Sequence, residues 1–275
     1  MSRIAFLGTG SMNEAILGGL IAAGTDPSQV VATVRRAERA AELAGRHGVV
    51  AVAESENPAA NPEAVRDAAV VILGVKPVGI TDLARSIAPS LAPETVVVSV
   101  AAAVSIAQLE AALPAGQPVV RTMPNTPARL GKGVVSVSAG TSTTPEQLAR
   151  VKSLFEAVGT VVEIPESQVD ALSAISGSGP AYAFYLAEAM AAAGAELGLD
   201  PELSALLARE TVAGAGAMLA EPGADAAALR RAVTSPNGTT ERAIAAFDDG
   251  GIPAIIATGA RAAAARAAEI TASLG

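Results

Sequence analysis

The hydrophobic pattern of the chain changes near its middle. From residue 1 to about 165, short apolar runs alternate with amphipathic stretches, which is typical of a βαβ protein. The runs cover residues 4–7, 30–34, 70–73, 96–100, 119–123, 134–137 and 160–164. Runs of this kind are buried on both faces, so we expect a parallel sheet covered by helices. Its ligand crevice should lie at the carboxyl ends of the strands.

After Pro165 the strand-like runs stop, and long Ala-rich segments take their place. These segments, at 180–198, 201–220, 225–234, 239–249 and 253–273, predict helices. Small residues, such as those from Ala213 to Ala217, would let helix backbones approach closely. A region this rich in Ala has few large side chains for its own core, so a core shared between subunits is expected. The predicted fold is α/β, with a Rossmann-type doubly wound sheet over residues 1–165 and an all-helical domain over 166–275.

Composition narrows the class of protein. The 275 residues are 51% hydrophobic and 17% charged, which favours a folded globular chain over a disordered one. The absence of Cys excludes disulfides, thiolate metal sites and a cysteine nucleophile, and we expect no metal site. The first apolar run is too short for a signal segment, and the longest uncharged stretches are short or are broken by Gly and Pro. We therefore expect a cytoplasmic protein with no membrane segment.

The net charge is −8, and the acidity is concentrated in residues 166–275. Such a surface repels phosphate backbones, and no cluster of Lys and Arg interleaved with aromatic residues is present. Nucleic-acid binding is therefore not expected. A solvated helical surface explains the acidity without any partner.

A glycine turn follows the first apolar run. Because it opens a predicted helix, its backbone N–H groups can face a pyrophosphate. Asn13 stands where the third glycine of the usual dinucleotide fingerprint would be. A plain strand-to-helix turn remains an alternative, but the order strand, turn, helix, strand favours a dinucleotide. The residues assigned to this turn are Leu7, Gly8, Thr9, Gly10, Ser11 and Met12.

Two arginines, Arg35 and Arg36, end the second apolar run, where an NAD site would normally place a carboxylate for the ribose 2′-hydroxyl. Guanidinium groups match a 2′-phosphate bidentately, so NADPH is predicted as the cofactor, with NADH weaker. Two solvated arginines at a helix start are the alternative interpretation.

Three further loops follow predicted strands at the same edge of the sheet. Pro and Gly are common in ordinary loops, which would explain each of these loops taken singly. The first loop contains Gly74, Val75, Lys76 and Pro77, the second Val100, Ala101 and Ala102, and the third runs from Arg121 to Pro127.

The helical half contains two hydroxyl-rich segments, Ser173 to Tyr182 and Val233 to Glu241, each of which opens a predicted helix. Helix starts expose N–H donors that could hold an anion such as a substrate carboxylate. Ser or Thr caps alone would also explain both segments.

The ordered set GTGSM, GVKP, RTMPNTP, SGSGPAY and TSPNGTT resembles the pyrroline-5-carboxylate reductase family over essentially the whole chain. The resemblance implies a Rossmann domain, a helical domain that interlocks two subunits, and reduction of 1-pyrroline-5-carboxylate to L-proline, the last step of proline biosynthesis. It also implies a homodimer through the helical domain, which could assemble further into a ring of dimers.

Carried over residue by residue, the resemblance places Arg35 and Asn61 near the adenosine ribose, and Asn125 and Thr126 beside the nicotinamide. Family members usually have Gly and Asn where this chain has Thr9 and Ser11, and Gly where it has Asn237. Asn tolerates a left-handed backbone, so the turn at 237 is expected to survive. The residues that match the substrate pocket are Ser173, Ser235, Gly238, Thr239 and Thr240.

The chemistry available in the helical half is limited. His47 is the only histidine and Lys152 the last lysine, so residues 166–275 contain no His, Lys or Cys. Oxidation of a hydroxy acid would require a base there, whereas reduction of a cyclic imine could proceed with a hydroxyl such as that of Thr240. Because the resemblance places Thr240 near the ring nitrogen of the substrate, it implies that the catalytic role belongs to Thr240.

Two other functions stay open from the sequence. The first is another NADP-linked reductase on the same scaffold, acting on a related cyclic imine or on a deazaflavin. The second is a nucleotide-binding regulatory protein, which would not need the paired hydroxyl-rich loops.

Overall fold

The computed structural model describes residues 3–273, which form two compact units. Unit 1 contains the chain up to residue 177 together with the end of the chain from residue 263, and unit 2 contains residues 178–262. Each unit is described by itself below.

Unit 1 is built on an eight-stranded sheet with the order β3-β2-β1-β4-β5-β6-β7-β8. Neighbouring strands are parallel except for the pair β6 and β7. The strands are β1 (Arg3–Leu7), β2 (Val30–Val34), β3 (Val50–Ala53), β4 (Ala68–Leu73), β5 (Val96–Ser99), β6 (Val119–Pro124), β7 (Gly133–Ala139) and β8 (Gly159–Glu163).

All seven apolar runs form strands, but the sequence prediction was wrong in two respects. It missed β3, a strand of four residues at the edge of the sheet with Val50 49% exposed, although its residues are all apolar. It also assumed a wholly parallel sheet. Only residues 125–132 connect β6 to β7, and they hold the short 3-10 helix η4 (Thr126–Leu130). A parallel crossover needs about a dozen residues, so the chain turns back and β7 runs antiparallel.

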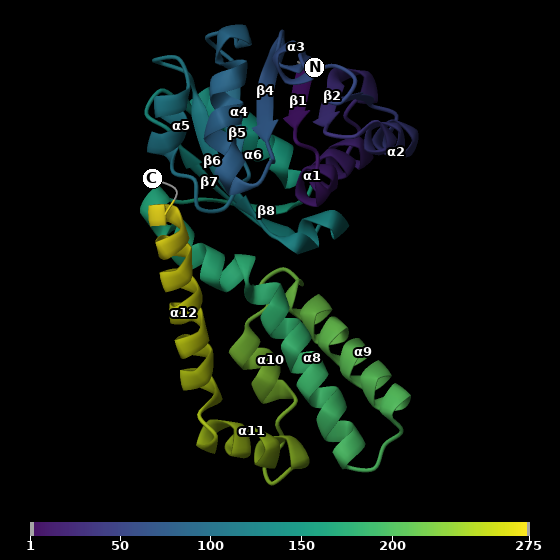
Figure 1. Ribbon diagram of the computed structural model, residues 1–275. Helices are drawn as coiled ribbons and strands as arrows, with labels where there is room; N and C mark the ends of the chain where they lie inside the picture. The colour runs from purple at the N-terminus through teal and green to yellow at the C-terminus, as the bar shows by residue number, and fades with distance from the viewer. Residues whose placement is uncertain (1–2, 274–275) are drawn as a thin grey trace. The chain divides into compact units, whose positions relative to one another are not determined.

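Helices cover both faces of the sheet (Figure 1). Phe6 and Leu7 are adjacent in β1 and point to opposite faces, where each is fully buried. Phe6 belongs to a hydrophobic cluster with residues of α1, α2 and α6, and Leu7 to a cluster with residues of α3, α4 and α5. The helices are α1 (Ser11–Ala22), α2 (Ala37–His47), α3 (Ala60–Ala64), α4 (Ile80–Ile87), α5 (Ile106–Ala112) and α6 (Pro145–Glu156).

A short helix, α7 (Val169–Leu172), leads into a π-helical turn, η6 (Ser173–Gly177), at the end of this part of unit 1. The five predicted helices follow as α8 (Gly179–Glu196), α9 (Pro201–Leu219), α10 (Ala226–Ala232), α11 (Thr239–Asp249) and α12 (Ile252–Ser273), of which the last turns belong to unit 1. Helices α8 and α9 approach closely, since the Ser204 hydroxyl donates to the carbonyl oxygen of Ala191 at 2.6 Å. A Cβ on Gly194 would lie 2.1 Å from the same Ser204 oxygen.

Unit 2 leaves much of its apolar surface exposed. Helix α8 buries none of its 18 residues, and Phe184 and Tyr185 are 69% and 73% exposed. On α9, a Cβ at Gly214 or Gly216 would meet nothing within 4 Å. An apolar surface of this kind normally marks an interaction site. Among the described residues, no helix combines the length and the apolar character that crossing a membrane requires.

A charge cluster joins α1 to α2 on the outside of the sheet. The carboxylate of Glu14 accepts hydrogen bonds from Arg39 and Arg46, and the His47 ring nitrogen Nε2 lies 3.3 Å from Glu14 Oε1. Burial alone raises the pKa of Glu14. The hydrogen bonds from Arg39 and His47, together with the charges of Arg39 and Arg46, outweigh burial and hold that pKa below its ordinary value.

This lowered pKa predicts how stability depends on pH. Because the pKa of Glu14 is lower in the folded than in the unfolded chain, ionised Glu14 stabilises the fold at neutral pH, and the stabilisation is lost as the pH falls through the folded-state pKa. The variant Glu14→Gln should lower the free energy of unfolding in urea by about 1 kcal/mol at pH 7, since solvent screens one side of the cluster. The deficit should shrink toward pH 3. Glu38→Gln, at an exposed glutamate of α2, serves as control, and a deficit that does not change with pH would contradict the prediction.

Candidate nucleotide and substrate site

The predicted cofactor loops line one edge of the sheet, which includes the point where the strand order reverses. Strand β1 lies between β2 and β4, and the loops after β1, β2, β4, β5 and β6 all leave carboxyl ends at the same edge of the sheet. Ligands of doubly wound sheets bind at such a switch point. The structure therefore brings the predicted cofactor loops of unit 1 together along one edge.

Glycines allow the loops after β1 and β4 to touch. A Cβ on Gly8, whose φ is +70°, would lie 2.3 Å from Val75 Cγ1, and a Cβ on Gly74 would lie 2.2 Å from Asn13 Nδ2. Gly10 differs, because a Cβ there would meet nothing within 4 Å. It is the N-cap of α1, and within the described part of the chain no side chain caps that helix, so its first N–H groups border open space. This arrangement fits the pyrophosphate of a dinucleotide.

Asn13 explains how the turn works without its third glycine. Its side chain is buried, and Nδ2 donates to the carbonyl oxygens of Leu7 at 3.3 Å and Ile72 at 3.5 Å, which ties the ends of β1 and β4 together. Sequence reasoning noted Asn13 only as a departure from the fingerprint. A polar residue at a position that normally requires a small one was the available signal.

A chain of hydrogen bonds runs from the glycine turn to the end of β3. The Gly8 N–H donates to Thr33 Oγ1 at 3.3 Å, and the Thr33 hydroxyl donates to Asn61 Oδ1 at 2.6 Å. Asn61 Nδ2 then donates to Glu54 Oε2 at 3.1 Å. Asn61 therefore lies beside the end of β2, where Arg35 and Arg36 are exposed. The sequence analysis missed Thr33 and Glu54, because their partners are distant along the chain. Thr33 contacts residues 25 and 28 positions away, and Glu54 contacts a residue 7 positions away.

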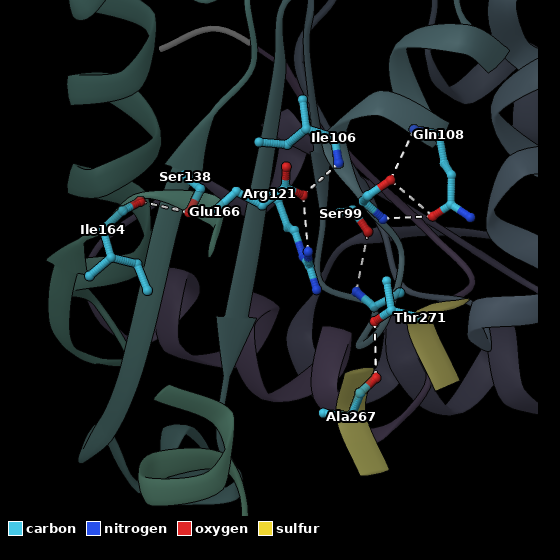
Figure 2. A network of polar contacts seen from close by, with 11 residues as sticks. Ser99, Ile106, Gln108, Arg121, Ser138, Ile164, Glu166, Ala267 and Thr271 are labelled. Carbon is cyan, nitrogen blue, oxygen red and sulfur yellow. Dashed lines mark hydrogen bonds and ion pairs between the residues drawn. The ribbon is translucent and has the colours of Figure 1, made fainter. Parts of the chain in front are cut away.

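The loop after β5 is held at both ends. The Ala101 N–H donates to Ser99 Oγ at 3.3 Å, and Ala103 adopts a left-handed φ of +64°, which is strained for a residue with a Cβ. At the far end, the Ile106 N–H at the start of α5 donates to Glu166 Oε1 at 2.7 Å. The segment that contains Val100, Ala101 and Ala102 is thus fixed between two anchors, at Ser99 and at the Ile106–Glu166 hydrogen bond. Figure 2 labels these three anchoring residues.

Glu166 also binds Arg121, a buried residue within β6. Arg121 Nη1 lies 2.9 Å from Glu166 Oε1, and the Arg121 side chain is only 5% exposed (Figure 2). Within residues 3–273, Arg121 Nε has no hydrogen-bond partner. One carboxylate therefore neutralises a buried guanidinium and caps the loop after β5, a role that the motif RTMPNTP did not reveal.

Asn125 links three elements. Its Nδ2 donates to the carbonyl oxygen of Ser176 at 2.9 Å, and its Oδ1 accepts from the Val134 N–H at 2.9 Å. The π-helical turn η6, which begins at Ser173, is thereby attached to the ends of β6 and β7. A Cβ on Gly177 would lie 2.9 Å from Ser173 Oγ, so Gly177 leaves room for that hydroxyl. Thr126 is exposed at the start of η4.

The second hydroxyl-rich loop belongs to unit 2, where Ser235, Gly238, Thr239 and Thr240 lie together before and at the start of α11. Asn237 has φ +59°, which confirms that asparagine supports the left-handed turn, and its N–H donates to Glu241 Oε2 at 2.8 Å. Among the described residues, neither Gly238, the N-cap of α11, nor Ser178, the N-cap of α8, makes a side-chain capping hydrogen bond. Neither helix start is therefore capped by the Ser or Thr side chain that the simplest capping interpretation requires.

The Glu166 network gives a prediction about stability. Glu166→Ala would leave the Arg121 guanidinium buried without its charge partner and the Ile106 N–H without an acceptor. The free energy of unfolding should fall by about 2 kcal/mol, measured by urea denaturation at pH 7. Glu163→Ala is the matched control, because Glu163 is 54% exposed and pairs with Lys152 at the surface. Its loss should cost less than about 0.5 kcal/mol. Equal losses of unfolding free energy in the two variants would show that the buried pair stabilises the fold no more than the surface pair does.

Known proteins match both halves of the chain. The pyrroline-5-carboxylate reductase dimerisation family matches residues 166–270, and the family of NADP oxidoreductases described as coenzyme F420-dependent matches residues 3–103. Pyrroline-5-carboxylate reductase of Pseudomonas aeruginosa is 42% identical, over 99% of this chain and 98% of its own. That of Mycobacterium tuberculosis is 40% identical, over 98% of this chain and 97% of its own. The structure of the Coxiella burnetii reductase superposes with a TM-score of 0.91 at 34% identity, over 98% of both chains. This chain belongs to the pyrroline-5-carboxylate reductase family.

Proposed function

We propose roles for individual residues of this chain in its reaction, which is the reduction of 1-pyrroline-5-carboxylate to L-proline by hydride transfer from NADPH. When bound, NADPH supplies the hydride, and the protein binds, orients and shields the reacting groups. The observation that carries the proposal is the uncapped start of α11, where Thr239 and Thr240 combine free N–H groups with two hydroxyls.

The cofactor is proposed to lie along the loops at the switch edge of unit 1. The bare N–H groups at the start of α1 would hold the pyrophosphate, and Arg35 and Arg36 the 2′-phosphate. Asn61 would contact the adenosine ribose, and Asn125 and Thr126 would border the nicotinamide. The remaining contacts are assigned to Leu7, Gly8, Thr9, Gly10, Ser11, Met12, Gly74, Val75, Lys76, Pro77, Val100, Ala101 and Ala102.

The substrate carboxylate is proposed to bind the N–H groups of Gly238 and Thr239, with help from the hydroxyls of Ser173 and Ser235. A helix start attracts a negative charge, and α11 has no side chain that competes for its donors. The Thr240 hydroxyl would then hydrogen-bond the ring nitrogen and either deliver its proton or orient the imine.

The chemistry of the substrate fits these residues. Reduction of a C=N bond places hydride on carbon while the nitrogen carries or receives a proton, so no base for an alcohol is required. This agrees with a second half that contains no His, Lys or Cys. Orientation of the imine would then account for most of the rate.

We also propose that two copies of the chain pair through the helical region, with 165/166 as the functional boundary. The exposed apolar side chains of α8 and the match of residues 166–270 to a dimerisation family support this proposal. Assembly of dimers into a ring and a cytoplasmic location both stay predictions.

Thr240→Val tests the catalytic assignment, because valine keeps the shape of threonine and removes the hydroxyl. If the hydroxyl delivers the proton, turnover measured by NADPH consumption with 1-pyrroline-5-carboxylate should fall about 100-fold. If it only orients the imine, the Michaelis constant for the substrate should rise about tenfold. In either case the Michaelis constant for NADPH should not change.

Thr258→Val is the matched control. Thr258 is an exposed threonine of α12 whose hydroxyl donates to the Ala254 carbonyl oxygen within the same helix. Its kinetics should equal those of the original chain. Unchanged kinetics in Thr240→Val would reject both roles, and an absence of activity in the unmodified chain would reject the proposed function itself.

The oligomer is tested by sedimentation of the full chain at micromolar concentration. We expect a dimer or a multiple of it, with an interface above about 2,000 Å². Tyr185→Asp, at an apolar side chain that is 73% exposed in the single chain, should shift the protein toward monomers. Val50→Asp places the same charge on an exposed valine of unit 1 and should leave the oligomer intact. A stable and active monomer of the unmodified chain would contradict the proposal.

A further inference from the structure

The first residue after β3, Glu54, lies beside the two arginines that end β2. The Glu54 N–H donates to the carbonyl oxygen of Val34 at 2.8 Å, and the Ser55 N–H donates to that of Arg35 at 3.2 Å. These bonds continue the parallel pairing of β2 and β3 by one step beyond the strands. Glu54 and the two arginines therefore follow adjacent strands at the same corner of the switch edge.

The Glu54 side chain points into the hydrogen-bond chain that starts at the glycine turn. Its Oε2 accepts from Asn61 Nδ2 at 3.1 Å, and Asn61 Oδ1 accepts from the Thr33 hydroxyl at 2.6 Å. Because Thr33 occupies the oxygen of the Asn61 amide, the amide NH₂ must face Glu54. Among the described residues, no ion pair joins Glu54 to Arg35 or Arg36, so its charge is not neutralised by them.

The two kinds of charge at this corner have opposite effects on a nucleotide. A carboxylate at the ribose of an adenosine accepts its 2′-hydroxyl, as in NAD sites, and repels a 2′-phosphate of nearly two negative charges. Guanidinium groups attract that phosphate. The preference for one nicotinamide cofactor over the other is then set by the balance between these groups.

We infer that Glu54, oriented by Asn61, is a cofactor-selectivity residue that lowers the preference for NADPH over NADH below the level that Arg35 and Arg36 would give alone. The inference rests on the proposed function, since it needs the adenosine ribose at this corner. The structural observation behind it is the half-buried carboxylate that is bound to Asn61 and left unpaired by the adjacent arginines.

The variant Glu54→Gln isolates the charge, because glutamine keeps an oxygen that can accept from Asn61. Binding is measured by calorimetry with two probes, adenosine 2′,5′-bisphosphate and adenosine 5′-monophosphate, on the full chain. The dissociation constant for the bisphosphate should fall about fivefold, as expected for removing one charge near the phosphate across partly aqueous surroundings, while that for the monophosphate should stay or rise. The ratio of kcat/KM for NADPH to that for NADH should rise by about tenfold.

Glu56→Gln is the matched control, with the same charge change at an exposed carboxylate two residues away. It should leave the bisphosphate-to-monophosphate ratio unchanged. The inference is overturned if Glu54→Gln and Glu56→Gln give the same ratio. It is also overturned if Glu54→Gln weakens both probes equally, which a purely structural role would produce.

Arg35→Ala separates failure of the inference from failure of the proposed function. It should weaken the bisphosphate about tenfold and leave the monophosphate nearly unaffected. If Arg35→Ala behaves so while Glu54→Gln leaves the ratio unchanged, only the inference fails. If the unmodified chain binds neither probe, the cofactor placement and the inference fail together.

Discussion

The candidate site depends on how closely the loops after β1 and β4 approach each other. Gly8 lacks room for a Cβ because of Val75, and Gly74 lacks it because of Asn13. The buried Asn13 amide then spans the gap between the ends of the two strands. This contact leaves the start of α1 open at Gly10, and the Thr33–Asn61–Glu54 chain extends from the same turn to the end of β3. A substitution at either glycine would therefore change the whole nucleotide edge and not one contact.

The helices in the second half of the chain pack in a different way. Its helices are held together by small side chains, as at Gly194 and Ser204, and leave their large apolar residues exposed. Residues 166–275 also contain no His, Lys or Cys. A region built from small residues and hydroxyls suits a reaction in which hydride transfer is the demanding step and the proton requires only a weak donor.

The sequence predicted the alternation of strands and helices because apolar periodicity is local, and it located the hydroxyl-rich loops because their motifs are continuous. It missed β3, a strand of only four residues at the edge of the sheet, and the antiparallel β7, which depends on the length of one connection. It also missed Thr33, Glu54 and Glu166. Each of these acts through a partner brought close by the fold, and Glu166 binds Arg121 across 45 residues of chain. The residues assigned to the substrate from the family pattern stay predictions.

The short edge strand β3 also bears on how the molecule avoids self-association. An exposed strand edge presents unpaired N–H and C=O groups that can template edge-to-edge aggregation with another sheet. Here the strand is only four residues long, and the carboxylates of Glu54 and Glu56 follow it directly. Short length and charge are two of the features by which natural sheets discourage such pairing. The carboxylate that faces the nucleotide in our proposal thus also discourages a strand of another molecule from pairing with β3.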